Sequence, residues 1–133
     1  MTESRAAVEP PAPVIRTIAM PADTNPAGDI FGGWLMAQMD LAAGAVAARH
    51  ARGRCATVAV EAMAFHRPVH VGDEVSIYGE LVKVGRTSMH IRVEVWRRPR
   101  SAETREMVTE AVLVYVALDE QGRKRTLPLV PQD

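Results

Sequence analysis

The sequence contains a single cysteine and no excess of either charge. Cys55 has no second cysteine with which to form an intrachain disulfide, which fits a reducing compartment such as the cytoplasm. The 16 basic and 16 acidic side chains balance, so the overall charge attracts neither nucleic acid nor an anionic membrane. We therefore predict a cytoplasmic protein without a nucleic-acid or membrane partner, in which any phosphate site is local.

Long apolar segments and several common motifs are also missing. No run of about 18 apolar residues is uninterrupted; residues 34–48 come nearest, but they are too short and contain Asp40. The first 13 residues lack the apolar segment of a secretory signal. There is no Gly-x-Ser-x-Gly elbow and no Walker or dinucleotide glycine spacing, which disfavours a serine hydrolase and those nucleotide-binding classes.

The sequence does contain enough apolar material for one domain. Its 133 residues and 47% hydrophobic content suit a single globular core. Residues 1–13 hold three prolines and two acids, so we predict a disordered tail there, followed by one domain over residues 14–130.

Local patterns predict one helix and five strands. Residues 34–51 are rich in Ala, Leu and Met, which favours a helix, whereas residues 21–33 are rich in Pro, Gly, Asn and Asp and predict a loop. The expected fold class is α+β, with a run of long antiparallel strands after a central helix. Alternating or β-branched segments predict the strands at 14–20, 55–65, 74–84, 87–96 and 107–118.

The predicted helix has no clear polar face. Its sequence, WLMAQMDLAAGAVAA, is apolar almost all round, which is typical of a helix buried on every side. A single sheet covers only one side of a helix, so we expect a second subunit to cover the rest.

Asp40 is the exception within this helix, between Met39 and Leu41. A buried carboxylate without partners is costly, so its presence requires a reason. One interpretation is a local polar edge, beside Gln38 or an incoming arginine. The other, which the apolar neighbours favour, is a catalytic carboxylate, because desolvation makes a carboxylate a stronger base near neutral pH.

The loop before the helix, DTNPAGDIFGG at residues 23–33, ends where backbone N–H groups are unpaired and carry partial positive charge. Gly32 and Gly33 let a substrate approach that backbone closely. Such amides can hold a carbonyl oxygen as it becomes an oxyanion, and one donor contributes about 3 kcal/mol in the transition state. The alternative is a turn that only caps the helix.

Several long segments together resemble the acyl-CoA thioester hydrolases of the YciA type. They are MPADTNPAGDIFGGWLMAQMDLAAG, VAVEAMAFHRPVHVGDEV, VGRTSMHIRVEVW and TEAVLVYVALDEQGRKRTLP. The resemblance runs from about Ile18 to Leu129 and implies a hotdog fold, an antiparallel sheet wrapped around a long central helix. It also implies active sites at a dimer interface and commonly a trimer of dimers, a homohexamer.

The resemblance implies roles for residues in the loop and the helix. Asp40 matches the family's helix aspartate, which acts as general base or nucleophile on an acyl-CoA thioester. Asn25 matches the loop asparagine, and Asp29 matches a polar position where related enzymes often have Asn. Asp29 and Asp40, one from each of two subunits, could flank a thioester across a two-fold axis.

The resemblance also implies where coenzyme A binds. The family's Gly-x-Thr-Ser turn matches Gly85, Thr87 and Ser88, which are expected near the pantetheine or the phosphates, with Arg86 between them. One of two basic clusters, at residues 97–100 and 123–125, either holds the nucleotide phosphates or is simply solvated. Coenzyme A is part of the substrate, so no cofactor is expected.

Three further signals carry weaker interpretations. His66 and His70 are four residues apart, but Pro68 between them and the extended pattern argue against a metal site. Arg67 is either a phosphate contact or a solvated arginine. Cys55 begins a strand with no obvious activating base, so a core thiol is favoured.

We therefore predict an acyl-CoA thioesterase in which Asp40 activates water or attacks the thioester directly, while amides near Gly32 and Gly33 hold the oxyanion. Two alternatives remain open. A hotdog hydratase would use a His-centred pair, and the body of the predicted helix and the loop before it contain no histidine. A non-catalytic acyl-CoA sensor would usually carry a DNA-binding module, for which 133 residues leave no room.

Overall fold

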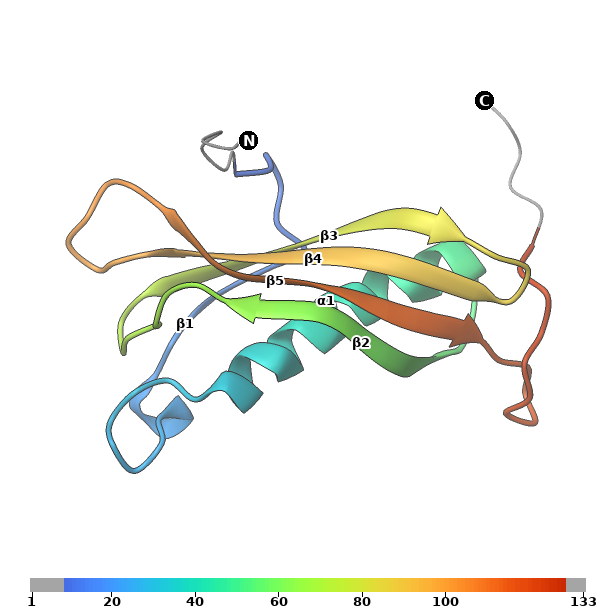
Figure 1. The fold of residues 1–133 in the computed structure, drawn as a ribbon, viewed down its shortest axis with the longest axis horizontal. Coiled ribbons are helices and arrows are strands. Elements are labelled where there is room, and N and C mark those ends of the chain that lie inside the picture. Colours follow the sequence, from blue (N-terminus) through green and yellow to red (C-terminus); the bar gives the residue numbers. More distant parts are fainter. Residues whose placement is uncertain (1–8, 129–133) are drawn as a thin grey trace.

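One long helix packs against a five-stranded antiparallel sheet in the computed structural model, which describes residues 9–128 (Figure 1). The predicted α+β class is confirmed. The sheet order is β1-β3-β4-β5-β2, so the first and second strands form its two edges. The elements are β1 Ile15–Ile18, a 3-10 turn at Pro21–Asp23, α1 Gly32–Ala51, β2 Cys55–Phe65, β3 Glu74–Val84, β4 Ser88–Arg98 and β5 Glu106–Ala117.

The element boundaries follow the sequence patterns closely. The bounds of β2 and β3 are those predicted, and those of β4 and β5 shift by one or two residues. The helix starts two residues earlier than predicted, at Gly32, because propensity alone disfavours glycine in a helix. The predicted domain ends at residue 130 and the predicted tail covers residues 1–13, so the tail's first eight residues and the domain's last two lie outside the described residues.

The core lies between α1 and the concave face of the sheet. On β4, alternate apolar residues are fully buried against the helix, as their spacing predicts. Burying each such side chain contributes about 1.5–3 kcal/mol to folding. The buried face of α1 is made mostly of alanines, which let the helix lie close to the sheet. These two sets are Met89, Ile91, Val93 and Val95 on β4, and Leu35, Met39, Ala42, Ala43, Ala47 and Ala51 on α1.

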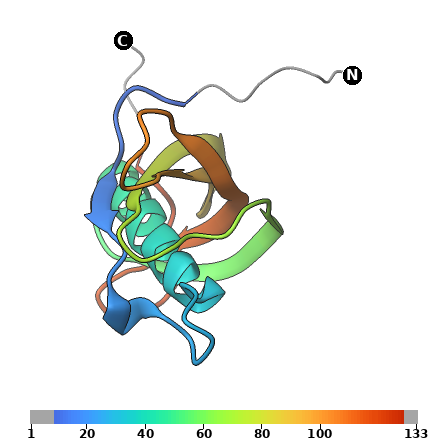
Figure 2. The same ribbon diagram turned by 90° about the vertical axis from the view of Figure 1, so that its left-hand side faces the viewer.

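The opposite face of α1 is open in the single protomer. Figure 2 shows the sheet curving around one side of the helix. Leu41 is 63% exposed and Met36 is 42% exposed, and Asp40 lies on the same exposed face. Within one protomer the helix is therefore buried on its sheet side only.

The two ends of the molecule carry different loops. At the end where α1 stops, the Thr87 carbonyl accepts from the Ala117 amide (2.9 Å) and the Arg54 carbonyl accepts from the Leu118 amide (2.9 Å). This places the β3–β4 hairpin beside the helix C-terminus (Figure 1). At the other end, the Phe65 ring lies beside Gly32, the first residue of α1. Among residues 9–128, no helix is both long enough and apolar enough to cross a bilayer.

Candidate active site

Asp40 is held by two hydroxyl groups from the sheet. Thr57 Oγ1 donates to Asp40 Oδ1 at 2.7 Å, and the Tyr115 hydroxyl approaches the same oxygen at 2.5 Å. The Tyr115 hydroxyl also lies 2.9 Å from the backbone carbonyl oxygen of Asp40. Within residues 9–128, no basic side chain forms an ion pair with this carboxylate, so the predicted alternative of an incoming arginine is not seen within one protomer.

Strand pairing explains why the two hydroxyls converge. Thr57 on β2 is paired with Tyr115 on β5, so both side chains point to the helix side of the sheet. The register shifts directly after Thr57, which leaves Val58 as a bulged residue. Bulges of this kind redirect side chains and are common beside active sites. Sequence reasoning missed both residues; a tyrosine within the apolar strand β5 was the signal that could have pointed to one of them.

Tyr115 is suited to remain a donor. Its side chain is only 3% exposed. Burial, and then its hydrogen bond to Asp40, raise the pKa of the Tyr115 hydroxyl well above its ordinary value. The hydroxyl therefore stays protonated throughout the neutral range and can donate only to acceptors within reach, which here belong to Asp40.

Asn25 shapes the loop before the helix. Its side-chain Oδ1 accepts from the amides of Ala27 (3.0 Å) and Asp29 (3.1 Å), and its own amide donates to the Asp29 carbonyl at 2.7 Å. Gly28 completes the turn with a positive φ of 89°, which favours glycine. Asp29 is exposed on this loop. In the protomer, Asn25 thus acts as a loop organiser with its amide oxygen already occupied.

The start of α1 offers backbone amides beside a pocket. Phe31 is the N-cap residue and its side chain makes no capping hydrogen bond. The Trp34 amide donates to the Phe31 carbonyl at 3.1 Å, so within residues 9–128 the amides of Gly32 and Gly33 are the first-turn donors left for another acceptor. A Cβ at Gly33 would lie 3.2 Å from the Phe31 ring, so a larger residue there would require this exposed ring to shift. The pocket has a volume of about 440 Å³ and is lined by Ile30, Gly32, Leu35, Phe65, His66, Arg67, Pro68 and Val69.

Arg67 is at this end of the molecule but is engaged internally. Its Nη1 donates to the Met107 carbonyl at 2.8 Å, and its Nε lies 3.5 Å from Glu106 Oε2. The neighbouring His66 contacts Glu110 through Nε2 at 3.0 Å. The structure therefore places Arg67 and Gly32 around the same pocket. Because Nη1 and Nε of Arg67 already contact Met107 and Glu106, only part of its guanidinium remains for a ligand.

The Gly85–Ser88 turn connects β3 to β4 at the opposite end. The Gly85 amide donates to the Ser88 carbonyl at 2.8 Å, and a Cβ at Gly85 would lie only 2.8 Å from Ser88 Oγ. The carbonyls of Arg86 and Thr87 accept from the Leu127 and Ala117 amides, at 2.8 and 2.9 Å, which ties the turn to the end of β5 and the C-terminal segment. The turn is firmly anchored, with its side chains at the rim of the sheet.

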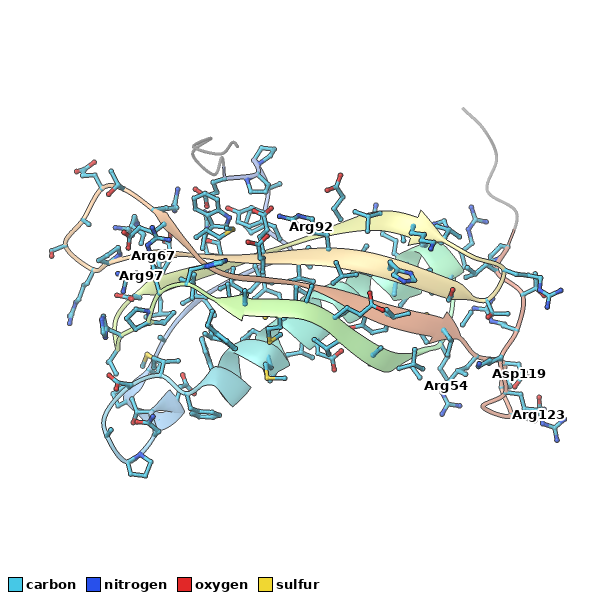
Figure 3. All side chains as sticks on the ribbon, in the orientation of Figure 1. Arg54, Arg67, Arg92, Arg97, Asp119 and Arg123 are labelled. Atoms are coloured by element: carbon cyan, nitrogen blue, oxygen red, sulfur yellow. The ribbon has the colours of Figure 1, made fainter. Side chains whose placement is uncertain are left out.

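The predicted site residues thus form three separate groups in one protomer. Asp40 lies eight residues after Gly32 on the same helix, which corresponds to about 12 Å along the axis. The Gly85–Ser88 turn lies at the opposite end of the molecule from the start of α1 (Figure 1) and from Arg67, which is labelled in Figure 3. No single small group can contact all three sets within one protomer.

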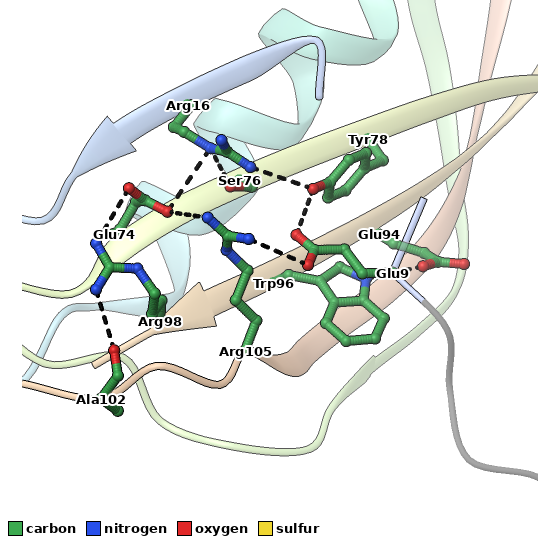
Figure 4. A network of polar contacts seen from close by, with 10 residues as sticks. All are labelled: Glu9, Arg16, Glu74, Ser76, Tyr78, Glu94, Trp96, Arg98, Ala102 and Arg105. Atoms are coloured by element: carbon green, nitrogen blue, oxygen red, sulfur yellow. Dashed lines mark hydrogen bonds and ion pairs between the residues drawn. The ribbon is translucent and has the colours of Figure 1, made fainter. Parts of the chain in front are cut away.

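The two basic clusters differ in how far their charge is neutralised. Arg97 is 14% exposed and pairs with Asp73 (3.3 Å) and Glu106 (2.8 Å), while Arg98 pairs with Glu74 (3.4 Å). Figure 4 shows Arg98 and Arg105 both directed at Glu74, within a network that also includes Arg16 and Glu9.

The second cluster is at the end where α1 stops. Figure 3 shows Arg54 and Arg123 there, beside Asp119. Arg125 is committed to structure, since it donates to the carbonyls of Ala51 and Leu118, both at 2.8 Å, and so caps the helix C-terminus.

Within residues 9–128, Cys55 and the pair His66 and His70 form neither a reactive thiol site nor a metal site. Burial raises the pKa of the Cys55 thiol, and the opposing effect of Arg125 is smaller. The raised pKa makes the thiol less reactive. His66 and His70 do not share a helix. Within residues 9–128, three or more His, Cys, Asp or Glu side chains do not gather into a metal-binding group.

Comparison with known proteins identifies the family to which this chain belongs. Residues 27–103 match the thioesterase superfamily. The acyl-CoA thioester hydrolase YciA of Escherichia coli is 51% identical over 119 residues, which span 87% of this chain and 90% of that protein.

Solved structures agree in sequence and shape. A hexameric thioesterase from Yersinia pestis superimposes with a TM-score of 0.88 at 48% identity, covering 92% of this chain and 100% of that chain. A hexameric hotdog fold thioesterase from Campylobacter jejuni gives 0.82 at 37% identity, covering 87% and 90%. The predicted hotdog fold is confirmed, and the chain belongs to the thioesterase superfamily, among the acyl-CoA thioester hydrolases of the YciA type.

Proposed function

We propose that this chain hydrolyses acyl-CoA thioesters to a carboxylic acid and coenzyme A, with Asp40 as the reacting carboxylate. The observation that carries the proposal is Asp40 itself, held by Thr57 and Tyr115 on the open face of a helix whose other neighbours are apolar. The relatives named acyl-CoA thioester hydrolases supply the substrate class.

The active unit is at least a dimer, and we propose a hexamer like that of the Yersinia pestis relative. The open face of α1 and the edge strand β2 expose apolar side chains that water does not stabilise. A second copy placed on this face would bury them and desolvate Asp40. The exposed apolar side chains are Met36, Leu41, Val58, Val60 and Phe65.

The reaction geometry also requires two protomers. The attacking group must lie about 3 Å from the thioester carbon while the oxyanion donors lie about 3 Å from its carbonyl oxygen. Asp40 and Gly32 are about 12 Å apart along one helix, which is too far for both contacts. We propose that amides near Gly32 and Gly33 of one protomer hold the carbonyl oxygen. Asp40 of another protomer then acts at the carbonyl carbon of the same thioester. Asp29 and Asn25 would border that site through the loop which they shape.

Asp40 acts on the carbonyl carbon in one of two ways. As a general base it removes a proton from water, and the resulting hydroxide adds to the carbonyl. As a nucleophile it forms a mixed anhydride, which water then hydrolyses. In both routes the C–S bond breaks and the coenzyme A thiolate leaves. Label found in Asp40 after a single turnover in heavy-oxygen water identifies the anhydride route, because it enters when water attacks the aspartyl carbonyl of the anhydride.

We propose that coenzyme A binds at the end where α1 stops. Gly85, Thr87 and Ser88 form an anchored rim there, and Arg86 lies within the same turn. Arg123 and Lys124 belong to the second basic cluster at this end, whereas Arg97 and Arg98 of the first cluster are paired with carboxylates. Arg67 lies at the opposite end, so its contact with the same coenzyme A would come from a different protomer.

The decisive test is thiol release from a panel of acyl-CoAs, short to long, by the wild type and by Asp40→Asn. Asparagine keeps the size and polarity of the side chain but cannot act as a base, so we expect kcat to fall by roughly a hundredfold or more with folding retained. Equal turnover by the two proteins would remove Asp40 from the mechanism. If the wild type bound acyl-CoA but released no thiol, the sensor alternative would replace the enzyme.

A further inference from the structure

We propose that Tyr115 is a positioning residue for the hydrolysis: its hydroxyl, together with Thr57, fixes Oδ1 of Asp40 and leaves Oδ2 to act on the substrate. The inference rests on the proposed function, and it assigns each carboxylate oxygen a separate task. Tyr115 lies outside residues 27–103, where the chain matches the superfamily.

The contacts are concentrated on one oxygen. Thr57 Oγ1 and the Tyr115 hydroxyl lie 2.7 and 2.5 Å from Oδ1. Among residues 9–128, no donor is in hydrogen-bond contact with Oδ2. Two hydroxyl protons directed at Oδ1 draw negative charge onto it and weaken it as a base or nucleophile. Oδ2 is thus the oxygen whose lone pairs remain for water or the thioester carbon.

Tyr115 also ties the carboxylate to its own helix. The same hydroxyl lies 2.9 Å from the Asp40 carbonyl oxygen, so its single proton has two acceptors, both on one residue. This contact restricts rotation of the Asp40 side chain, because a carboxylate that turns away loses the nearest donor. A base held in one rotamer reacts more often than one that samples several.

The tyrosine itself is rigidly placed. Its side chain is 3% exposed, and its ring faces Gly44, where a Cβ would be 3.7 Å from Cε2. Thr57, in contrast, is exposed on the edge strand, next to the Val58 bulge. Of the two donors, Tyr115 is therefore the one whose position is set by the protomer core, and we assign it the larger part in orientation.

The test compares Tyr115→Phe with Tyr78→Phe, because these are the chain's two tyrosines. Tyr78 is similarly buried, but its hydroxyl contacts Arg16 on β1 and Glu9 in the segment before β1, not Asp40. We expect Tyr115→Phe to lower kcat by roughly ten- to hundredfold with little change in KM. Tyr78→Phe should leave kcat within about twofold, and matched melting temperatures would show that both variants fold.

A double-mutant cycle separates positioning from a general structural effect. In an Asp40→Asn background, Tyr115→Phe should cause almost no further loss of kcat, since the group that it positions is gone. An equal loss in both backgrounds, or full activity of Tyr115→Phe beside an active wild type, overturns the inference and leaves the proposed function standing.

A spectroscopic arm tests the inference without turnover. With ¹³C-labelled aspartate carboxyl groups, the Asp40 signal is identified by its loss in Asp40→Asn. That signal should move in Tyr115→Phe and stay in place in Tyr78→Phe. An unmoved signal in Tyr115→Phe overturns the inference even if the wild type proves inactive, whereas a shifted signal with an inactive wild type supports the contact and removes only the proposed function.

Discussion

Asp40 could be predicted as a candidate catalytic residue from the sequence, but its hydrogen-bond partners could not. Its apolar neighbours on the helix made it a candidate from the sequence alone. Its partners did not follow from the sequence, because Thr57 is 17 positions away and Tyr115 is 75 positions away. Only the pairing of β2 with β5 brings the two hydroxyls to one oxygen. The predicted roles of Asp29, Asn25 and the Gly85–Ser88 turn remain predictions, because these residues do not contact Asp40 within one protomer.

Tyr115 should make the protein lose stability at alkaline pH. The pKa of its hydroxyl is raised in the folded chain, chiefly by burial. Above about pH 10 the unfolded chain releases this proton and the folded chain keeps it, so stability falls as pH rises. In a Tyr78→Phe background, we expect Tyr115 to contribute a fall of about 1.4 kcal/mol per pH unit.

Urea unfolding between pH 8 and pH 11 measures this contribution. The slope should be smaller once Tyr115→Phe is added to the same background, because no tyrosine then titrates. Identical slopes for the two proteins would mean that the Tyr115 proton leaves the folded and unfolded chains equally easily, contrary to its burial.

At the scale of elements, α1 is fitted to its sheet by small side chains. Ala42, Ala43 and Ala47 are fully buried against the sheet. The pattern of apolar residues predicted the helix and all five strands, with every boundary within two residues of the observed one. It did not predict the two register shifts in β2, after Thr57 and after Glu61, because a bulge depends on the partner strand as much as on local sequence.

Gly44 gives a stability prediction within this helix. A Cβ there would lie 3.7 Å from the Tyr115 ring, an ordinary contact, and alanine favours a helix more than glycine does. Gly44→Ala should therefore stabilise the protein by about 0.5–1 kcal/mol.

The check is the urea midpoint at equal protein concentration, with an unchanged slope against urea. A lower midpoint would show that the space between α1 and β5 has no room for a methyl group. Thiol release by this variant should match the wild type, since the Tyr115 contact with Asp40 is preserved.

At the scale of the whole molecule, the protomer exposes the surface that its proposed assembly would need. Leu41 is 63% exposed and Val58 is 54% exposed, on neighbouring elements beside Asp40. Other exposed apolar side chains, such as Val82 and Val84, lie on β3 toward the other edge of the sheet. The sequence indicated that a partner was needed, but the relative placement of two copies is not encoded in any local pattern.

Leu41→Asp should disrupt the assembly. In the proposed assembly a carboxylate at this position would be buried without a partner under the second copy, while the protomer core stays intact because Leu41 lies outside it. Sedimentation velocity should show smaller species than the wild type, and thiol release should fall with them.

Val71→Asp, in the turn before β3, is the matched control because it adds the same charge at an exposed apolar position away from this face. Wild-type assembly and activity in Leu41→Asp would place the subunit contact elsewhere on the protomer.

The separation of the Gly85–Ser88 turn from the start of α1 has a consequence for how the assembly responds to dilution. If coenzyme A rests on the turn of one protomer while its acyl group reaches the helix start of another, each bound substrate is a bridge between chains. Ligands that bind only the assembled state stabilise it by mass action. Saturating acyl-CoA would then slow subunit exchange. The enzyme would keep its quaternary structure at protein concentrations at which the ligand-free assembly dissociates.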